Sequence, residues 1–171
     1  GNKKSAGTKL VCFDSFFNNP GVYEIEMGTP MKKVLNDIGG GFKEPVKALQ
    51  IGGPLGGVIP IAEAEKLNLD FQEFTAAGFM LGHASIVSIP KDFPMVEYIH
   101  HLFEFTAEES CGKCFPGRLG SYRGKEMFDQ LKSKTAKIPL KVLNDLLLTM
   151  KNGCLCALCG AIPTPIMNIL K

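Results

Sequence analysis

The 171-residue sequence lacks several features that would place it in a specialised class. No apolar run approaches the about 18 residues needed to cross a membrane, so we expect no direct membrane insertion. The net charge is only +2 and no cluster of Lys or Arg is present, which argues against a nucleic-acid partner. The polar residues 1–9 are not followed by the apolar segment of a secretion signal, so we expect a cytoplasmic location.

Signatures of independent catalysis are also lacking. The Gly-rich segment 52–57 has neither the Lys-Ser/Thr pair of a P-loop nor the spacing of a dinucleotide-binding fingerprint. We therefore interpret it as a tight loop that packs against a neighbouring element. No general acid/base pair and no nucleophile–base arrangement stands out, so we expect no catalysis by this chain alone.

Cysteines are concentrated in two short segments. Five of the six lie within 111–114 and 154–159. In Cys111-Gly112-Lys113-Cys114 the spacing can point both sulfurs at one metal, because Gly112 permits a tight turn between them. Two such pairs would supply the four thiolates of a tetrahedral zinc site or a four-iron cluster. Metal binding is favoured over three disulfides because 45% of the residues are hydrophobic, enough for a core, and no secretion signal is seen.

The first part of the chain, residues 1–91, has the pattern of an α+β domain. Asn18-Asn19-Pro20-Gly21 predicts a turn between two strands within 8–27. Thr29 is the expected N-cap of a helix with Pro30 at its first position, and three glycines from residue 39 end it. Strands are predicted at 46–51 and 84–89. A hairpin, a helix and further strands in this order indicate a β-grasp fold, a sheet curled around one helix.

The second part, residues 92–171, is predicted to be an all-helical, four-helix domain. Apolar periodicity indicates helices over 95–109, around 127–131, over 142–150 and after Pro163. His100 and His101 are adjacent on the first helix and cannot readily share one metal, so we expect them on a solvated face. His83, which precedes the last strand, is interpreted as a satisfied turn or core residue rather than a ligand.

The motifs resemble a known family. Glu109-Ser-Cys-Gly-Lys-Cys-Phe-Pro-Gly-Arg118, with Leu155-Cys-Ala-Leu158 and Pro163-Thr-Pro165, is similar to the iron–sulfur part of the flavin-carrying subunit of respiratory NADH dehydrogenase (complex I). NAD-linked hydrogenases and formate dehydrogenases share that subunit. Upstream, segments 19–24, 27–30, 38–41 and 50–57 resemble its soluble-ligand-binding β-grasp (SLBB) domain.

This resemblance implies an electron-transfer role. In the family, a [4Fe-4S] cluster is held by C-x-x-C-x-x-C and one remote Cys, which places ligands at Cys111, Cys114 and Cys156. The cluster takes electrons from FMN that NADH has reduced, and the FMN- and NADH-binding segment lies N-terminal to the β-grasp domain. That segment is not in this sequence, so we expect FMN and NAD to bind elsewhere and the chain alone not to oxidise NADH. Its expected partners are other subunits of an NADH-linked redox complex, which would be cytoplasmic or peripheral on the cytoplasmic side of a membrane.

The sequence departs from the family at the third ligand, where Gly117 replaces Cys. Cys159 stands where the family usually has Gly, and it forms a second C-x-x-C with Cys156. We therefore predict the ligand set Cys111, Cys114, Cys156 and Cys159. Other outcomes stay open at this point: Cys154 as the fourth ligand, a three-Cys cluster with an exogenous ligand, or a site that holds nothing.

Two functions of different kinds fit these residues. One is an electron-transfer fragment of an NADH:acceptor oxidoreductase, and the other is a non-redox scaffold or interaction module with zinc or no metal. Both keep the same fold. Colour, iron content and zinc content of the purified protein distinguish them.

Overall fold

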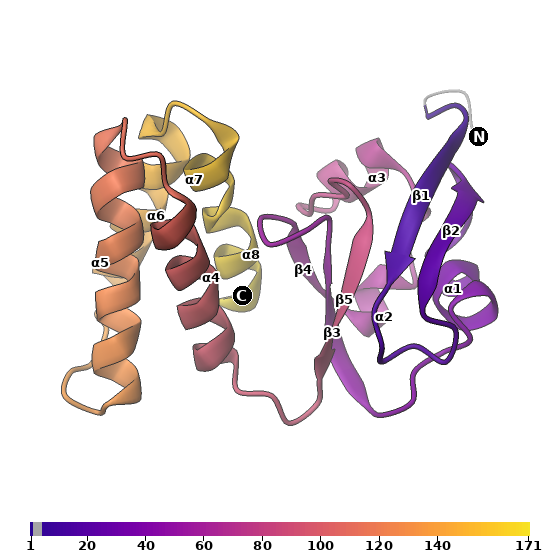
Figure 1. Ribbon diagram of the computed structural model, residues 1–171, viewed down its shortest axis with the longest axis horizontal. Coiled ribbons are helices and arrows are strands. Elements are labelled where there is room, and N and C mark those ends of the chain that lie inside the picture. Colours follow the sequence, from indigo (N-terminus) through magenta and orange to yellow (C-terminus); the bar gives the residue numbers. More distant parts are fainter. Residues whose placement is uncertain (2–4) are drawn as a thin grey trace. The chain divides into compact units, whose positions relative to one another are not determined.

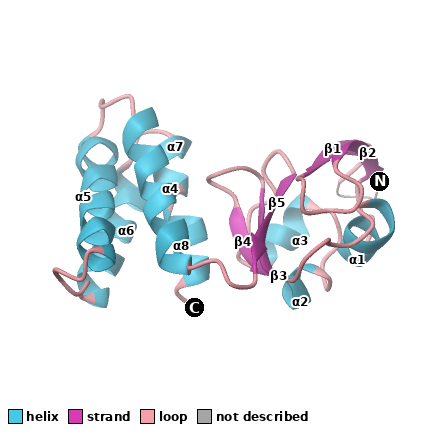
Figure 2. Cartoon of the chain, turned by 60° about the horizontal axis from the view of Figure 1, so that its bottom comes forward, coloured by secondary structure: helices cyan, strands magenta, loops and turns pink. Residues whose placement is uncertain are grey.

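The computed structural model describes residue 1 and residues 5–171, which form two compact units, Gly1–Asp92 and Phe93–Lys171 (Figure 1). The first unit contains one five-stranded sheet with short helices, and the second contains only helices and loops (Figure 2). None of the described helices is long and apolar enough to cross a membrane.

The sheet of the first unit has the strand order β2-β1-β5-β3-β4. Its strands are β1 (Thr8–Phe13), β2 (Gly21–Glu26), β3 (Val46–Ile51), β4 (Gly57–Pro60) and β5 (Ser85–Pro90). β1 and β5 run parallel, whereas β1–β2, β3–β4 and β3–β5 are antiparallel. β5 thus lies between the two hairpins, parallel to β1 and antiparallel to β3, and the α+β class with a β-grasp unit is confirmed.

The helix that the sheet encloses follows β2. It begins as α1 (Met31–Lys33) and continues as a π-helix, η1 (Val34–Ile38). Met31, Val34 and Leu35 are fully buried, and they join the core that lies between this helix and the sheet. Two further short helices, α2 (Ile61–Ala64) and α3 (Phe71–Ala76), lie within the connection from β4 to β5.

The predicted cap of this helix is wrong. The N-cap is Pro30, and the helix has no side-chain cap hydrogen bond. The hydroxyl of Thr29 instead donates to the carbonyl of Glu26 at 2.8 Å, so it closes the turn after β2. A true side-chain cap occurs at α3, where Asp70 Oδ1 accepts from the backbone N–H groups of Gln72 and Glu73.

The Gly-rich segment is the turn between β3 and β4. Gly52 has φ +97°, and a Cβ at this residue would lie 2.6 Å from the carbonyl oxygen of Leu81. A Cβ at Gly53 would lie 2.3 Å from Nε2 of His83, an exposed residue. The segment is therefore a tight loop packed against residues 81–83, as interpreted from the sequence. The short strand β4 that follows it was not predicted.

The second unit is built on two long neighbouring helices. Its elements are α4 (Met95–Glu109), α5 (Phe115–Lys132), α6 (Leu140–Gly153), α7 (Ala157–Ala161) and α8 (Pro163–Ile169). α5 is longer than the apolar pattern around 127–131 indicates. That pattern does not mark the earlier turns because the buried positions there include Gly117, Gly120 and Gly124 in place of bulky apolar residues. A Cβ at Gly124 would lie 2.1 Å from the ring of Phe103, so the missing side chain lets α5 approach α4 closely.

His100 does not lie on a solvated face. It is 8% exposed, and its Nε2 donates a hydrogen bond to Oδ1 of Asp129 at 2.6 Å. This pair joins α4 to α5. His101, by contrast, is exposed, as expected. The prediction failed for His100 because its partner is 29 residues away in sequence and no local pattern announces it.

Candidate metal centre

The two cysteine segments lie at the same end of the helical unit (Figure 1). The first connects the end of α4 to the start of α5, and the second connects the end of α6 to the start of α7. Gly112 has φ +72°, a left-handed conformation that favours glycine, and it turns the chain between Cys111 and Cys114. Four helix ends thus bring the five cysteines together.

Backbone donors from both segments converge on Cys114. The N–H of Leu155, from the second segment, and the N–H of Gly117, in the first turn of α5, hydrogen-bond to its sulfur and hold the pKa of the Cys114 thiol below its usual value. Such donors stabilise a thiolate, which is the form that binds a metal. The donor from Leu155 also links the second cysteine segment to the first.

Cys159 fills the space opened by Gly117. A Cβ placed on Gly117 would lie 3.0 Å from the sulfur of Cys159 and 2.9 Å from the sulfur of Cys114. Both thiols therefore border the volume that a side chain at position 117 would need. A thiol from α7 thus lies beside the position of α5 at which the sequence has Gly117.

The cysteines of the two segments differ in how far they are exposed to solvent. Cys111 and Cys156 are exposed, Cys114 is half-buried and Cys159 is 3% exposed. Burial raises the pKa of Cys159, and electrostatic interactions link it to Cys156, Cys114 and Cys111. Burial and the neighbouring Cys114 raise the pKa of Cys154 to about 12. The sixth cysteine, Cys12, is exposed on β1 in the other unit.

Two kinds of centre are bound by four Cys thiolates. Thiolates around a single zinc all bind at about 2.3 Å from one centre. In a four-iron cluster each thiolate binds its own iron, so the sulfurs lie farther apart. Among the described residues, no group of three or more His, Cys, Asp or Glu side chains is arranged to hold one metal ion. Cys159 interacts electrostatically with Cys111, Cys114 and Cys156, and backbone donors reach Cys114.

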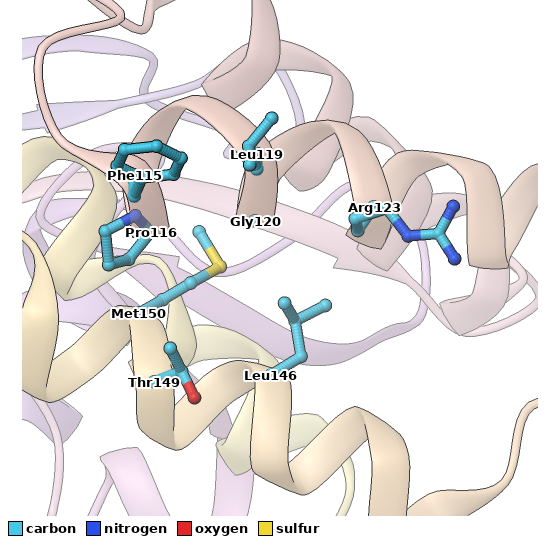
Figure 3. Close-up of a pocket in the computed structure, with 8 residues that line it drawn as sticks. All are labelled: Phe115, Pro116, Leu119, Gly120, Arg123, Leu146, Thr149 and Met150. Atoms are coloured by element: carbon cyan, nitrogen blue, oxygen red, sulfur yellow. The ribbon is translucent and has the colours of Figure 1, made fainter.

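An apolar groove of about 240 Å³ lies beside the first cysteine segment (Figure 3). Phe115, Leu119 and Arg123 of α5 line one side, and Leu146 and Met150 of α6 line the other. Phe115 directly follows Cys114 and is 68% exposed, and the guanidinium of Arg118 stacks on its ring at 4.9 Å. Apolar and basic surface therefore adjoins the thiols.

Sequence reasoning missed two groups at this site, the N–H of Leu155 and the hydroxyl of Ser110. The N–H of Leu155 is a backbone donor from the second cysteine segment, which residue type does not reveal. Ser110 lies 3.9 Å from the sulfur of Cys159, measured from its hydroxyl oxygen. The spacing of Ser110 and Gly112 indicates the local turn between them, but the proximity of Ser110 to Cys159 depends on the tertiary fold.

The structure thus combines a β-grasp unit with a helical unit in which cysteines of two segments come together. Residues 97–171 match the family described as the NADH-ubiquinone oxidoreductase-F iron-sulfur binding region. These residues, which make up most of the helical unit, are similar to that family. The resemblance seen in the sequence is thereby confirmed, and with it the [4Fe-4S] type of site.

Relatives extend the similarity over the whole chain. The NADP-reducing hydrogenase subunit HndC of Solidesulfovibrio fructosivorans is 33% identical over 99% of this chain and 35% of its own length. A polypeptide of the NADH-quinone oxidoreductase of Escherichia coli (strain K12) is 38% identical over 68% of this chain and 26% of its own length. The chain thus spans about a third of the relatives it matches.

A solved structure has the same fold. A chain of the NAD⁺-reducing [NiFe]-hydrogenase in the H₂-reduced state superposes with a TM-score of 0.86 at 24% identity. The match covers 99% of this chain and 29% of that chain. Both units of the present structure therefore occur within a single longer polypeptide of that enzyme.

Proposed function

We propose that this chain is the electron-transfer part of an NADH-linked oxidoreductase, and that Cys111, Cys114, Cys156 and Cys159 bind its [4Fe-4S] cluster. The observation that carries the ligand set is the position of the Cys159 sulfur, 3.0 Å from the point where a Cβ of residue 117 would stand. The site keeps four thiols although the family's third Cys is a glycine.

The residues around the thiols suit a bound anionic cluster. When bound, the cluster would take up and release one electron at a time. The N–H groups of Leu155 and Gly117 stabilise negative charge on the Cys114 sulfur. The side chains of Lys113 and Arg118 are exposed beside it and offset further negative charge. Burial of Cys159 keeps water from one side of the site, whereas the exposed Cys111 and Cys156 leave the opposite side open.

The proposal assigns the two parts of the chain different tasks. Residues 92–171 form the cluster-binding domain, and residues 1–91 form an SLBB-like β-grasp domain that contributes to assembly. Electrons come from FMN reduced by NADH outside these residues, and they leave to another subunit of the complex. That complex is cytoplasmic or is held on the cytoplasmic side of a membrane. The similarity to polypeptides of an NADH-quinone oxidoreductase and of an NADP-reducing hydrogenase supports this placement.

Iron analysis of anaerobically prepared protein tests the function. We expect about four irons and about four acid-labile sulfides per chain, with broad absorption near ~400 nm that dithionite bleaches. A colourless chain that contains stoichiometric zinc would contradict the proposal and support the scaffold alternative.

Single Cys→Ser variants test the ligand set. Replacement of Cys111, Cys114, Cys156 or Cys159 should remove most of the iron, because each would leave one iron without its thiolate. Cys12→Ser is the matched control, since Cys12 lies on β1 of the other unit. Cys154→Ser should also retain iron. Loss of iron in Cys154→Ser together with retention in Cys159→Ser would assign the fourth ligand to Cys154 instead.

A further inference from the structure

Ser110 lies between the first cysteine segment and Cys159. It follows the last residue of α4 in an extended conformation, with φ −65° and ψ 126°. Its hydroxyl oxygen is 3.4 Å from the backbone nitrogen of Gly112 and 3.9 Å from the sulfur of Cys159. The hydroxyl therefore connects a backbone donor of the first segment to a thiol of the second.

The direction of these two hydrogen bonds follows from the chemistry of the groups. The N–H of Gly112 can only donate, so the oxygen of Ser110 accepts from it, in the local turn that Ser side chains form two residues ahead. The hydroxyl hydrogen is then free to point elsewhere. In the metal-free thiol form, Cys159 can donate to Ser110. A metal-bound thiolate has no proton, so the bond to Cys159 must then be donated by the hydroxyl.

We propose that the hydroxyl of Ser110 is a positioning donor to the Cys159 thiolate, which holds that relocated ligand in place and raises the reduction potential of the site. This inference rests on the proposed function. Hydrogen bonds to ligand sulfur are among the factors that set the potential of iron–sulfur sites, because they stabilise the more negative reduced state. The N–H of Gly112 polarises the hydroxyl and strengthens its donation.

The proposed hydrogen bond gives Cys159 support that its own short helix, α7, does not provide. A Cys at position 117 would project from the first turn of α5, where it would be held by its own helix. Cys159 comes from α7, a helix of five residues, and so has less support from its own element. A hydrogen bond from the segment after α4 ties this thiol to the other ligands. Cys159 is also buried, so water does not compete freely for its sulfur.

The test compares Ser110→Ala with Ser110→Thr by redox titration monitored by electron paramagnetic resonance. The signal comes only from chains that contain the cluster, so incomplete assembly does not distort the potential. We expect Ser110→Ala to shift the midpoint potential downward and Ser110→Thr, which keeps the hydroxyl, to match the wild type. Ser133→Ala is the control, because that hydroxyl bonds to the Asp129 carbonyl at the other end of α5.

Each outcome bears on the inference. Complete loss of iron in Ser110→Ala but not in Ser110→Thr would support the positioning role. An unchanged potential in Ser110→Ala, or a shift that Ser110→Thr does not restore, would overturn the inference and leave the proposed function standing. A wild-type chain without iron would overturn the proposed function itself, and this inference with it.

Discussion

Gly117 and Cys159 are complementary in space, because the sulfur of Cys159 lies 3.0 Å from the point where a Cβ of residue 117 would stand. The glycine is buried in the first turn of α5, and the cysteine is buried in α7. A side chain at position 117 and a thiol at position 159 therefore compete for the same volume.

This complementarity predicts that the two positions can be exchanged together but not singly. Gly117→Cys alone should crowd the sulfurs of Cys114 and Cys159, and overpacking of this kind costs about 1–3 kcal/mol. The double variant Gly117→Cys/Cys159→Gly should restore about four irons per chain, because it returns the thiol to the family's position. Iron content and thermal unfolding measure both effects.

Gly117→Ala is the matched control for this exchange. It introduces the same Cβ without a thiol, so it should lower stability and, combined with Cys159→Gly, should not restore iron. Full iron content in Gly117→Ala/Cys159→Gly would show that Cys159 is not a ligand.

Close packing of α4 against α5 gives a second prediction. Gly124→Ala would place a Cβ 2.1 Å from the rigid ring of Phe103. Alanine favours a helix by about 1 kcal/mol over glycine, but the clash should dominate and lower the free energy of unfolding by about 1–3 kcal/mol. Urea titration measures the change.

Gly120→Ala separates the clash from helix propensity. At Gly120 a Cβ would meet Met150 Cγ at 2.8 Å, and the flexible Met side chain can move. We therefore expect a near-neutral change there. Equal losses at Gly120 and Gly124 would contradict the role of the Phe103 ring.

Because His100 is buried, we expect the free energy of unfolding to depend on its hydrogen-bond partner, Asp129. Asp129→Ala removes the acceptor for its Nε2, and an unsatisfied buried donor costs about 1–3 kcal/mol. Partial burial acts to raise the pKa of Asp129, but the hydrogen bond and charge attraction of His100, together with Lys125, lower it overall.

The sign of the pH effect follows from that lowered pKa. The Asp129 carboxylate stabilises the fold at pH values above its unfolded pKa of about 3.9, and this contribution is lost as the pH falls through the lower folded value. The stability of wild type and Asp129→Ala should therefore differ at neutral pH and converge in acid. A constant difference down to the acid limit would exclude ionised Asp129 as the source.

The cap of α3 provides a test within the β-grasp unit. Asp70 is 2% exposed, and its Oδ1 accepts from two backbone N–H groups at 2.8 and 3.0 Å. Asp70→Ala should lower the free energy of unfolding by about 1 kcal/mol. Asp70→Asn keeps an acceptor oxygen and should lose less. An unchanged stability in Asp70→Ala would show that water replaces the cap.

The sequence predicted the secondary-structure elements whose signals lie within their own residues. The Asn-Asn-Pro-Gly turn and the strand at Val46–Ile51 have the expected positions, and so does α4 over Met95–Glu109. β4 was missed because a four-residue strand between glycines and Pro60 has little pattern of its own. The extent of α5 was missed because Gly120 and Gly124 lower helix propensity, and their packing role appears only when neighbouring helices are present.

The features of the candidate metal centre also divide into those that the sequence predicted and those that depend on the tertiary fold. Cysteine spacing pointed to a metal centre, and resemblance specified the kind of cluster. The mutual fit of Gly117 and Cys159, and the donor from Leu155 to Cys114, join residues about 40 apart in sequence that only the fold brings together. The burial of His100 is non-local for the same reason.

The hydrogen bond between His100 and Asp129 and the close approach at Gly124 hold α4 and α5 together without any contribution from sulfur. The packing between these two helices should therefore survive substitution of the cysteines, so loss of iron in a Cys→Ser variant would report on the ligand and not on separation of the helical pair.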